Sequence, residues 1–437
     1  MSVDGNNPSS TAAAAAPQPE SGSVPLAAQI SLKGFELPEF PPQASRLRQL
    51  TLTADIKLDE YQGKVQMPLD AGAIAQPPLP TLPPSITHLT LELFGLGFPG
   101  RPPFLEQLAR ALPNITTLTF FSCLIDGLDD ASRKDAEAFF QLLPHLQELH
   151  VIDSFARPGF FRTIGGIFED RSKQGQDSLK MVEVSYTFRG HQDRDFLARV
   201  QGEELPNLIV GGVVGASFDF MPEMVDELVE GETETAKAEE ERPDGDKEKE
   251  KEKVAEGILP FASDGRAPTA LKKRFEHLRT ESLQSVKVLN LGMWSLRPVE
   301  VGEILYACAG GGKAGLADLT VSILLEDNWF EEFIKGFIRH KGIGAELEGV
   351  EVIGAPDRAK REGEGKDENE DEAKGADRDE DENEKGRTHG LSLVRQADVE
   401  KLGQICPKLA KFGMSILKVK SAPHLLFFKD QGGWTQQ

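Results

Sequence analysis

Short apolar phrases recur along the chain at a nearly constant interval. Each phrase is an apolar residue, two variable residues, a second apolar residue, one variable residue and a third apolar residue. Clear copies begin at Leu47, Ile86, Ile115, Leu146, Leu179, Leu283, Leu316, Leu347 and Leu409, and a weaker copy broken by two glycines begins at Leu208. As far as Leu208, successive copies begin 29 to 39 residues apart. Apolar residues alternate in the second half of each phrase, which predicts a strand with one buried face.

Amphipathic stretches lie between the phrases. Their apolar residues recur every three or four positions, which predicts helices. The clearest stretches are Phe104–Leu112, Ala136–Leu143, Val301–Cys308 and Phe330–Ile338. Prolines such as Pro113 and Pro144 stand just before a phrase, where a proline separates the helix from the next strand. Strand, loop and helix repeated about every 30 residues predict parallel strands with helical crossovers, in which stacked neighbours bury each other's apolar faces.

Two acidic segments lengthen single steps of this period without shifting it. The steps from Leu208 to Leu283 and from Leu347 to Leu409 are 75 and 62 residues, and they return to ordinary length when the acidic segments are removed. Glu223–Glu256 holds 15 acidic and 6 basic residues, and Asp357–Arg387 holds 14 and 8. These segments therefore carry most of the net charge of −22. Such mixed-charge tracts bury little apolar area and are typical of solvated linkers.

The domain prediction follows from these patterns. Residues 1–28 are rich in Ala, Pro, Ser and Gly, and we expect them to be a disordered tail. Residues 29–437 are expected to form one α/β solenoid of about ten degenerate repeats. Disordered acidic insertions are expected at residues 221–264 and 356–389.

Composition narrows the classes of function. No basic stripe is present to bind a phosphate backbone, so we expect no nucleic-acid partner. Cys123, Cys308 and Cys406 lie far apart, which excludes a disulfide framework or a zinc motif and suits reduced thiols in the cytoplasm or nucleus. The N-terminus lacks the pattern of a signal peptide, and no apolar run is long enough to span a membrane. We expect an intracellular monomer that needs no cofactor.

The phrase Leu-x-x-Leu-x-Leu resembles the core of the leucine-rich repeat. The helix-bearing period near 30 is similar to the ribonuclease-inhibitor-like branch of that family. Long irregular repeats, Leu-Pro-x-Leu phrases and acidic insertions resemble fungal F-box-type leucine-rich-repeat proteins, over about residues 44–417. The resemblance implies parallel strands on a concave face and helices on a convex face.

The sequence also departs from this family. Where the family has Asn or Cys after the core phrase, Cys123, Ser154 and Thr187 fit only loosely, and other repeats carry residues such as Phe94. An F-box is a three-helix module that should precede the repeats. Leu37-Pro38-Glu39 is similar to its opening, but two prolines follow and a strand is already predicted from Leu47. No F-box is recognisable, and ubiquitin-ligase recruitment is not implied.

The strand residues between the apolar positions should form outward columns on the concave face. One predicted column is Thr51, Thr90, Thr119, His150, Glu183, Lys287, Thr320 and Glu351. The next is Thr53, Glu92, Phe121, Ile152, Ser185, Leu289, Ser322 and Ile353. Exposed apolar residues in a row are candidate anchors for a partner. We therefore predict a protein-binding site at Phe121, Ile152 and Leu289, with His150, Glu183 and Lys287 beside them.

Two classes of function remain open. The first is a non-catalytic protein-interaction scaffold or receptor. The second is an enzyme on an irregular α/β frame, which would need a compact pocket with titratable groups of shifted pKa. Gly310-Gly311-Gly312-Lys313 lacks the first glycine and the hydroxyl residue of a phosphate-binding loop, and it follows a predicted helix, so we interpret it as a helix cap. Cys123 occupies a ladder position, where its thiol can hydrogen-bond the neighbouring turn.

Overall fold

The computed structural model describes eight segments of the chain. They are residues 27–55, 79–187, 202–220, 266–281, 285–309, 315–356, 393–416 and 424–437. The predicted insertions at 221–264 and 356–389 lie outside these segments, except that Pro356 ends a strand. The predicted tail also lies outside them, except for Ala27 and Ala28.

One sheet of 13 strands, ordered as in the sequence, runs through the described part of the chain. The strands are β1 (Ala27–Leu32), β2 (Gln49–Ala54), β3 (His88–Glu92), β4 (Thr117–Phe121), β5 (Glu148–Ile152), β6 (Met181–Tyr186), β7 (Gly215–Phe220), β8 (Val288–Leu296), β9 (Asp318–Leu325), β10 (Gly349–Pro356), β11 (Lys411–Ile416), β12 (Leu425–Asp430) and β13 (Gly433–Gln436). Strands β1 to β11 pair in parallel, and β12 and β13 pair antiparallel.

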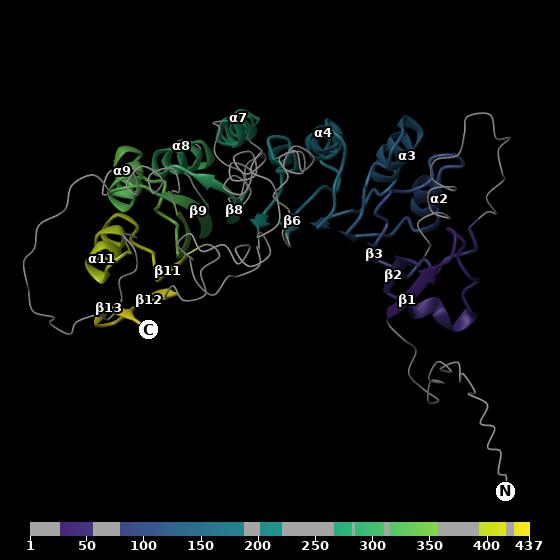
Figure 1. Ribbon diagram of the computed structural model, residues 1–437, viewed down its shortest axis with the longest axis horizontal. Helices are drawn as coiled ribbons and strands as arrows, with labels where there is room; N and C mark the ends of the chain where they lie inside the picture. The colour runs from purple at the N-terminus through teal and green to yellow at the C-terminus, as the bar shows by residue number, and fades with distance from the viewer. Residues whose placement is uncertain are drawn as a thin grey trace, which may run out of the picture.

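Helices join the parallel strands. They are α2 (Phe104–Ala111), α3 (Asp130–Gln141), α4 (Phe160–Lys173), α7 (Arg266–Thr280), α8 (Pro298–Ala309), α9 (Trp329–Arg339) and α11 (Gln396–Ile405), with the 3-10 helices η1 (Pro42–Arg46) and η2 (Leu205–Leu208). The sheet lines the inner side of an arc and the helices its outer side (Figure 1). The predicted fold is therefore confirmed: the chain is an α/β solenoid of the leucine-rich-repeat type.

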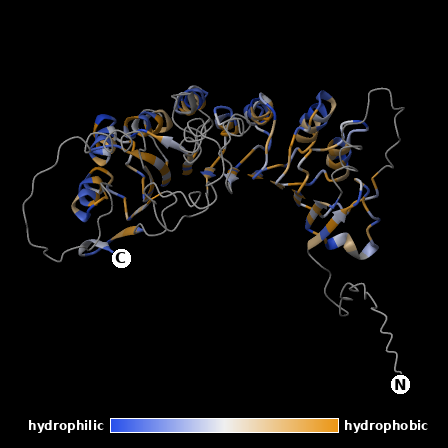
Figure 2. Cartoon of the chain, in the orientation of Figure 1, coloured by the Kyte–Doolittle hydropathy of each residue, from blue (hydrophilic) through white to orange (hydrophobic). Residues whose placement is uncertain are grey.

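The core lies between the sheet and the helices, where the repeat phrase predicts it. Leu89, Leu118 and Leu149 occupy one register position on β3, β4 and β5, and all three are buried. Leu50 and Val182 extend this row on β2 and β6. The strands carry many apolar residues, and the helices turn polar residues outward (Figure 2). Successive repeats thus share one elongated interior.

The predicted copy at Leu283 is three residues out of register. The phrase of β8 is Val286, Leu289 and Leu291, all buried, while Val288 is 45% exposed. The sequence Val286-Lys287-Val288-Leu289 fits the apolar pattern in either register. Pairing decides between them, since Leu289 aligns with Ala216 on β7 and Leu319 on β9.

The weak copy at Leu208 is also misplaced. Leu205–Leu208 forms η2, and the strand is β7, with the phrase Val213, Ala216 and Phe218. Ala216 occupies a position that a large apolar residue holds in most repeats. The apolar phrase of β7 is therefore difficult to recognise in the sequence.

The start of the solenoid differs from the predicted boundary, and its two ends are built differently. Ala27 and Ala28 belong to β1, where they pair with Gln49 and Leu50, and not to the tail. At the other end β12 and β13 form an antiparallel hairpin in place of a further repeat. Trp434 of this hairpin packs so closely on α11 that a Cβ at Gly403 would lie 2.7 Å from its Nε1 atom. The hairpin therefore covers the apolar end of the stack.

Candidate functional site on the concave face

Three columns of outward residues cover the concave face. The rim column runs along the first strand positions, from Gln49 and His88 through Met181 to Val288 and Asp318. The central column, in order from β2, is Thr51, Thr90, Thr119, His150, Glu183, Ser217, Asn290, Thr320 and Glu351. The third column contains Thr53, Glu92, Phe121, Ile152, Ser185, Asp219, Ser295, Ser322 and Ile353.

Four of the six predicted site residues lie together in these columns. Phe121 and Ile152 are register partners on β4 and β5, and Phe121 is 38% exposed. His150 and Glu183 are register partners on β5 and β6, with 2.7 Å between His150 Nδ1 and Glu183 Oε2. Ile152 and His150 share β5, so the apolar pair and the polar pair are adjacent.

The other two predicted residues are placed differently. Leu289 is fully buried in the core, so the prediction that it faces outward is wrong. Lys287 is exposed, but it precedes β8 and aligns with Ala317 rather than with the central column. The register shift of β8 explains both corrections. Asn290 holds the central position that was expected for Lys287.

Leu93 extends the apolar pair of Phe121 and Ile152, although the sequence pattern did not predict it as a site residue. It directly follows β3, it is 52% exposed, and its backbone φ is 62°, in the left-handed region. Its amide donates a hydrogen bond of 2.9 Å to the carbonyl of Phe121. A left-handed leucine costs about 1 kcal/mol or more, and its exposure here gives no burial in return. We call Leu93, Phe121 and Ile152 the apolar patch.

A second apolar surface lies on the rim column. Met181 and Val288 flank Gly215 in register, and both are at least 40% exposed. Val214, the residue before Gly215, is similarly exposed. These three large side chains, Met181, Val214 and Val288, form what we call the rim patch. The apolar patch and the rim patch lie toward opposite ends of the strands, with the central column between them.

Three carboxylates lie in the central and third columns on β6, β7 and β10. The negative charges of Glu183 and Glu351 act on Asp219. Burial raises the pKa of Asp219, and the negative charges of the two glutamates raise it further. Hydrogen bonds from the Phe220 amide and the Asn290 side chain lower the pKa but do not cancel the rise. We call Glu183, Asp219 and Glu351 the acidic centre. The sequence reasoning missed Asp219, although the phrase Val213-x-x-Ala216-x-Phe218 places it in the third column.

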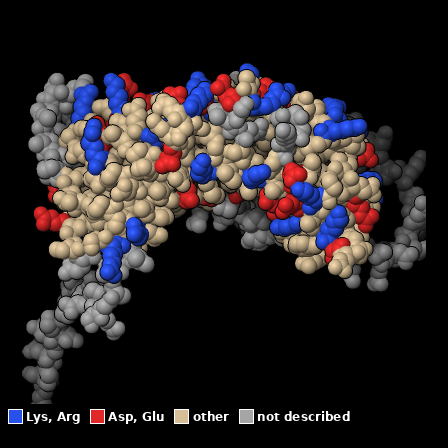
Figure 3. Space-filling model, turned by 180° about the vertical axis from the view of Figure 1, so that it is seen from behind, with Lys and Arg blue, Asp and Glu red and all other residues tan. Residues whose placement is uncertain are grey.

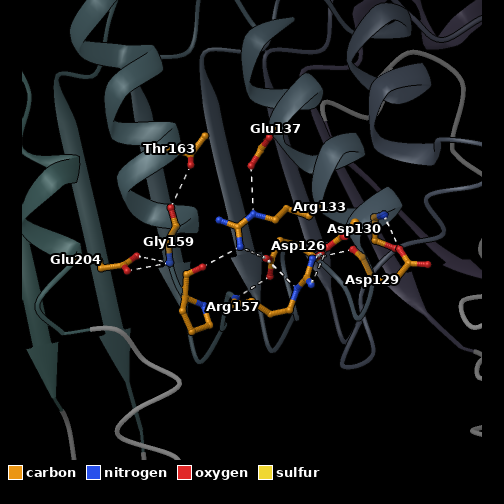
Figure 4. Close-up of polar contacts among 11 residues, drawn as sticks. Asp126, Asp129, Asp130, Arg133, Glu137, Arg157, Gly159, Thr163 and Glu204 are labelled. Carbon is orange, nitrogen blue, oxygen red and sulfur yellow. Dashed lines mark hydrogen bonds and ion pairs between the residues drawn. The ribbon is translucent and has the colours of Figure 1, made fainter.

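A separate charged cluster bears on the enzyme alternative. Asp126, after β4, is fully buried, and Arg157 donates to it from its backbone amide at 2.8 Å and from Nε at 3.2 Å. Arg133 Nη1 lies 3.7 Å from the same carboxylate and donates to the carbonyl of Pro158 (Figure 4). Burial raises the pKa of Asp126, and the hydrogen bond and charges of these arginines oppose the rise. These groups satisfy one another's hydrogen-bonding capacity and connect successive repeats, so the cluster has a structural role.

The environment of Cys123 is also structural. Its thiol donates to the carbonyls of Leu91 at 3.2 Å and Phe121 at 3.3 Å, and its amide donates to Ser154 Oγ. Burial raises the pKa of the thiol to about 12. The predicted ladder role is confirmed, and a thiolate nucleophile is not favoured here. The glycines at 310–312 lie outside the described residues, directly after α8.

Charged side chains are unevenly distributed over the molecule. On the flank shown in Figure 3, Lys and Arg are frequent along the helical side, and much of the N-terminal half is uncharged. Within the described chain, no helix is both long and apolar enough to cross a bilayer. The same residues contain no group of three His, Cys, Asp or Glu side chains that could hold a metal ion.

Comparisons with known proteins assign no family to this chain. Neither a protein-family model nor a curated protein sequence matches this chain. Among solved structures, an internalin (inlF) from Listeria monocytogenes is similar, with 10% sequence identity and a TM-score of 0.31. The alignment covers 72% of this chain and 64% of the length of the internalin. The fold assignment therefore rests on the register of the chain's own strands, which is that of a leucine-rich-repeat solenoid.

Proposed function

We propose that this chain is a non-catalytic scaffold or receptor that holds a protein partner on its concave face, with the apolar patch as anchor. The observation that carries the proposal is the exposure of Leu93 beside Phe121. A leucine held in the left-handed region and left in solvent loses backbone stability without gaining burial. Contact with a partner would bury both side chains, and buried aromatic and aliphatic anchors supply most of the energy of an interface.

The shape and charge of the face support the same conclusion. An open arc of parallel strands offers a continuous surface to a partner, as other solenoids do. In the outward columns from β2 to β10 the charged residues other than His are Glu92, Glu148, Glu183, Asp219, Asp318 and Glu351. A phosphate backbone would be repelled by these carboxylates, so we propose a protein partner rather than a nucleic acid.

The proposal includes a reducing intracellular compartment and a monomeric chain. Cys123, Cys308 and Cys406 are buried and form no disulfide, as is usual for cysteines of cytoplasmic and nuclear proteins. A link to ubiquitin ligation is not part of the proposal. The described residues 27–54 form two strands and one short 3-10 helix, whereas an F-box needs three helices.

Affinity capture with matched variants tests the proposal. We would compare wild type with Phe121→Asp and with the control Ile338→Asp, which adds the same charge at a 57% exposed position on α9. Proteins captured by wild type and by the control, but lost with Phe121→Asp, are then purified and titrated. We expect Phe121→Asp to weaken binding by about 2 kcal/mol, or about 30-fold in Kd. Equal binding to all three proteins would refute a partner site on the concave face.

A further inference from the structure

The carboxylates of the concave face lack the partners that those of the helical face have. On the helices, Glu169 pairs with Lys173 and Arg274, and Glu303 pairs with Lys272. On the concave face, Glu183 contacts His150, and His424 Nε2 lies 3.6 Å from Glu351. Among the residues described, no Lys or Arg forms an ion pair with Glu183, Asp219 or Glu351. The described part of the concave face is therefore negatively charged, which favours a cationic group on a partner.

Two buried hydroxyls beside this centre have no hydrogen-bond partner. Ser185 is opposite Asp219 in register, is 2% exposed, and its Oγ makes no hydrogen bond. Ser322 is fully buried, and its Oγ is likewise without a partner. Both residues belong to the outward third column, on either side of Asp219 and β8. Buried polar groups are nearly always satisfied in proteins, so these two unused hydroxyls indicate a hydrogen-bonding partner that the described residues do not supply.

A bulge in β8 packs its backbone closely against Asp219. The pairing of β8 with β9 shifts between Leu291 and Ser295. A Cβ at Gly292, inside this bulge, would lie 2.8 Å from Asp219 Oδ1 and 3.0 Å from Asn290 Oδ1. The Gly292 amide also donates a 2.8 Å hydrogen bond to Asn290 Oδ1, which fixes the amide side chain. Any larger residue at Gly292 would displace the Asp219 carboxylate or the Asn290 side chain, so the glycine preserves the arrangement of these acceptors.

On the basis of the proposed function, we propose that the acidic centre receives an arginine or lysine side chain of the protein partner. Carboxylates on β6, β7 and β10 lie on this part of the face, and a guanidinium or ammonium group supplies several donors at once. The apolar patch lies on the preceding strands, and the rim patch lies on β6 to β8. The bound segment therefore carries a cationic residue together with apolar residues.

Selection from random peptides displayed on phage, with the full chain as bait, tests this chemistry. The selected peptides are synthesised and titrated by fluorescence anisotropy against wild type and Asp219→Asn/Glu351→Gln. The Asp219→Asn change keeps an acceptor for the Phe220 amide, and thermal unfolding checks that the variant is folded. The control is Glu248→Gln/Glu250→Gln, which removes the same charge from the acidic tract outside the described residues. Phe121→Ala reports separately on the apolar patch.

We expect the peptides to share an Arg or Lys together with apolar residues. Asp219→Asn/Glu351→Gln should weaken their binding by about tenfold or more, and the control by much less. Peptides without a cationic residue, or equal losses in the double variant and its control, would overturn the inference. If only Phe121→Ala weakens binding, the cation site is refuted while the proposed function stands. If no variant of the concave face changes binding, both are refuted.

Discussion

Glu169 should contribute a pH-dependent part of the stability, because it ties α4 to α7. Its carboxylate lies 2.9 Å from Lys173 Nζ and 2.7 Å from His277 Nε2, and it also pairs with Arg274. Burial alone would raise the pKa of Glu169, but these hydrogen bonds and the charge of Arg274 lower it to about 2. Both α4 and α7 also pack on η2. The contact therefore holds together repeats on both sides of the first acidic insertion.

The magnitude follows from the shift of this pKa. The folded pKa of about 2 lies below the ordinary value of 4.5, so the contribution is fully present above pH 4.5 and is lost as the pH falls toward 2. The shift corresponds to at most about 3 kcal/mol, and solvent screening of the exposed partners reduces this to about 1–2 kcal/mol. Glu169→Gln should therefore lower the free energy of unfolding by about 1–2 kcal/mol at neutral pH.

Urea unfolding as a function of pH measures this difference. The stability gap between wild type and Glu169→Gln should be constant above pH 4.5 and should narrow as the pH falls below it. Glu106→Gln is the control, because Glu106 is partly exposed and pairs with the exposed Arg110 within one helix, and such pairs contribute about 0.5 kcal/mol or less. A gap that stays the same down to about pH 3 would show that the Glu169 carboxylate is not the source of the effect.

Three further predictions concern the core and the insertions. Leu118→Ala should lower the free energy of unfolding by about 2–5 kcal/mol in urea, since Leu118 lies in the buried row with Leu89 and Leu149. A decrease below about 1 kcal/mol would contradict its place in the core. Gly165→Ala should destabilise by about 1–3 kcal/mol, because its Cβ would lie 2.4 Å from the carbonyl oxygen of Asn207, whereas Gly166→Ala, with nothing within 4 Å, should be neutral or slightly stabilising. Equal effects at the two glycines would refute this packing. Deletion of Glu223–Glu256 should leave the thermal midpoint nearly unchanged, and a drop comparable to the loss of a repeat would show that the segment is folded.

The sequence determined the type of fold and most of its strands. Apolar alternation is a local property, and where the inward positions are large, as with Leu89, Leu118 and Leu149, it leaves one possible register. The period also placed Phe121, Ile152, His150 and Glu183 on one face before their neighbours were known. These predictions hold because each repeat must bury its own apolar residues in the same way.

Only the tertiary structure decided the register of β7 and β8 and the composition of the concave site. Val286-Lys287-Val288-Leu289 satisfies two registers equally, and pairing with the adjacent strands buried Leu289 and brought Asn290 to the surface. Glu183, Asp219 and Glu351 are brought together from strands that are distant in sequence, so no local pattern links them. The left-handed backbone of Leu93 is likewise set by its turn, because its amide bonds to the next strand. Periodicity fixes which face a side chain takes, whereas strand pairing fixes which side chains meet there.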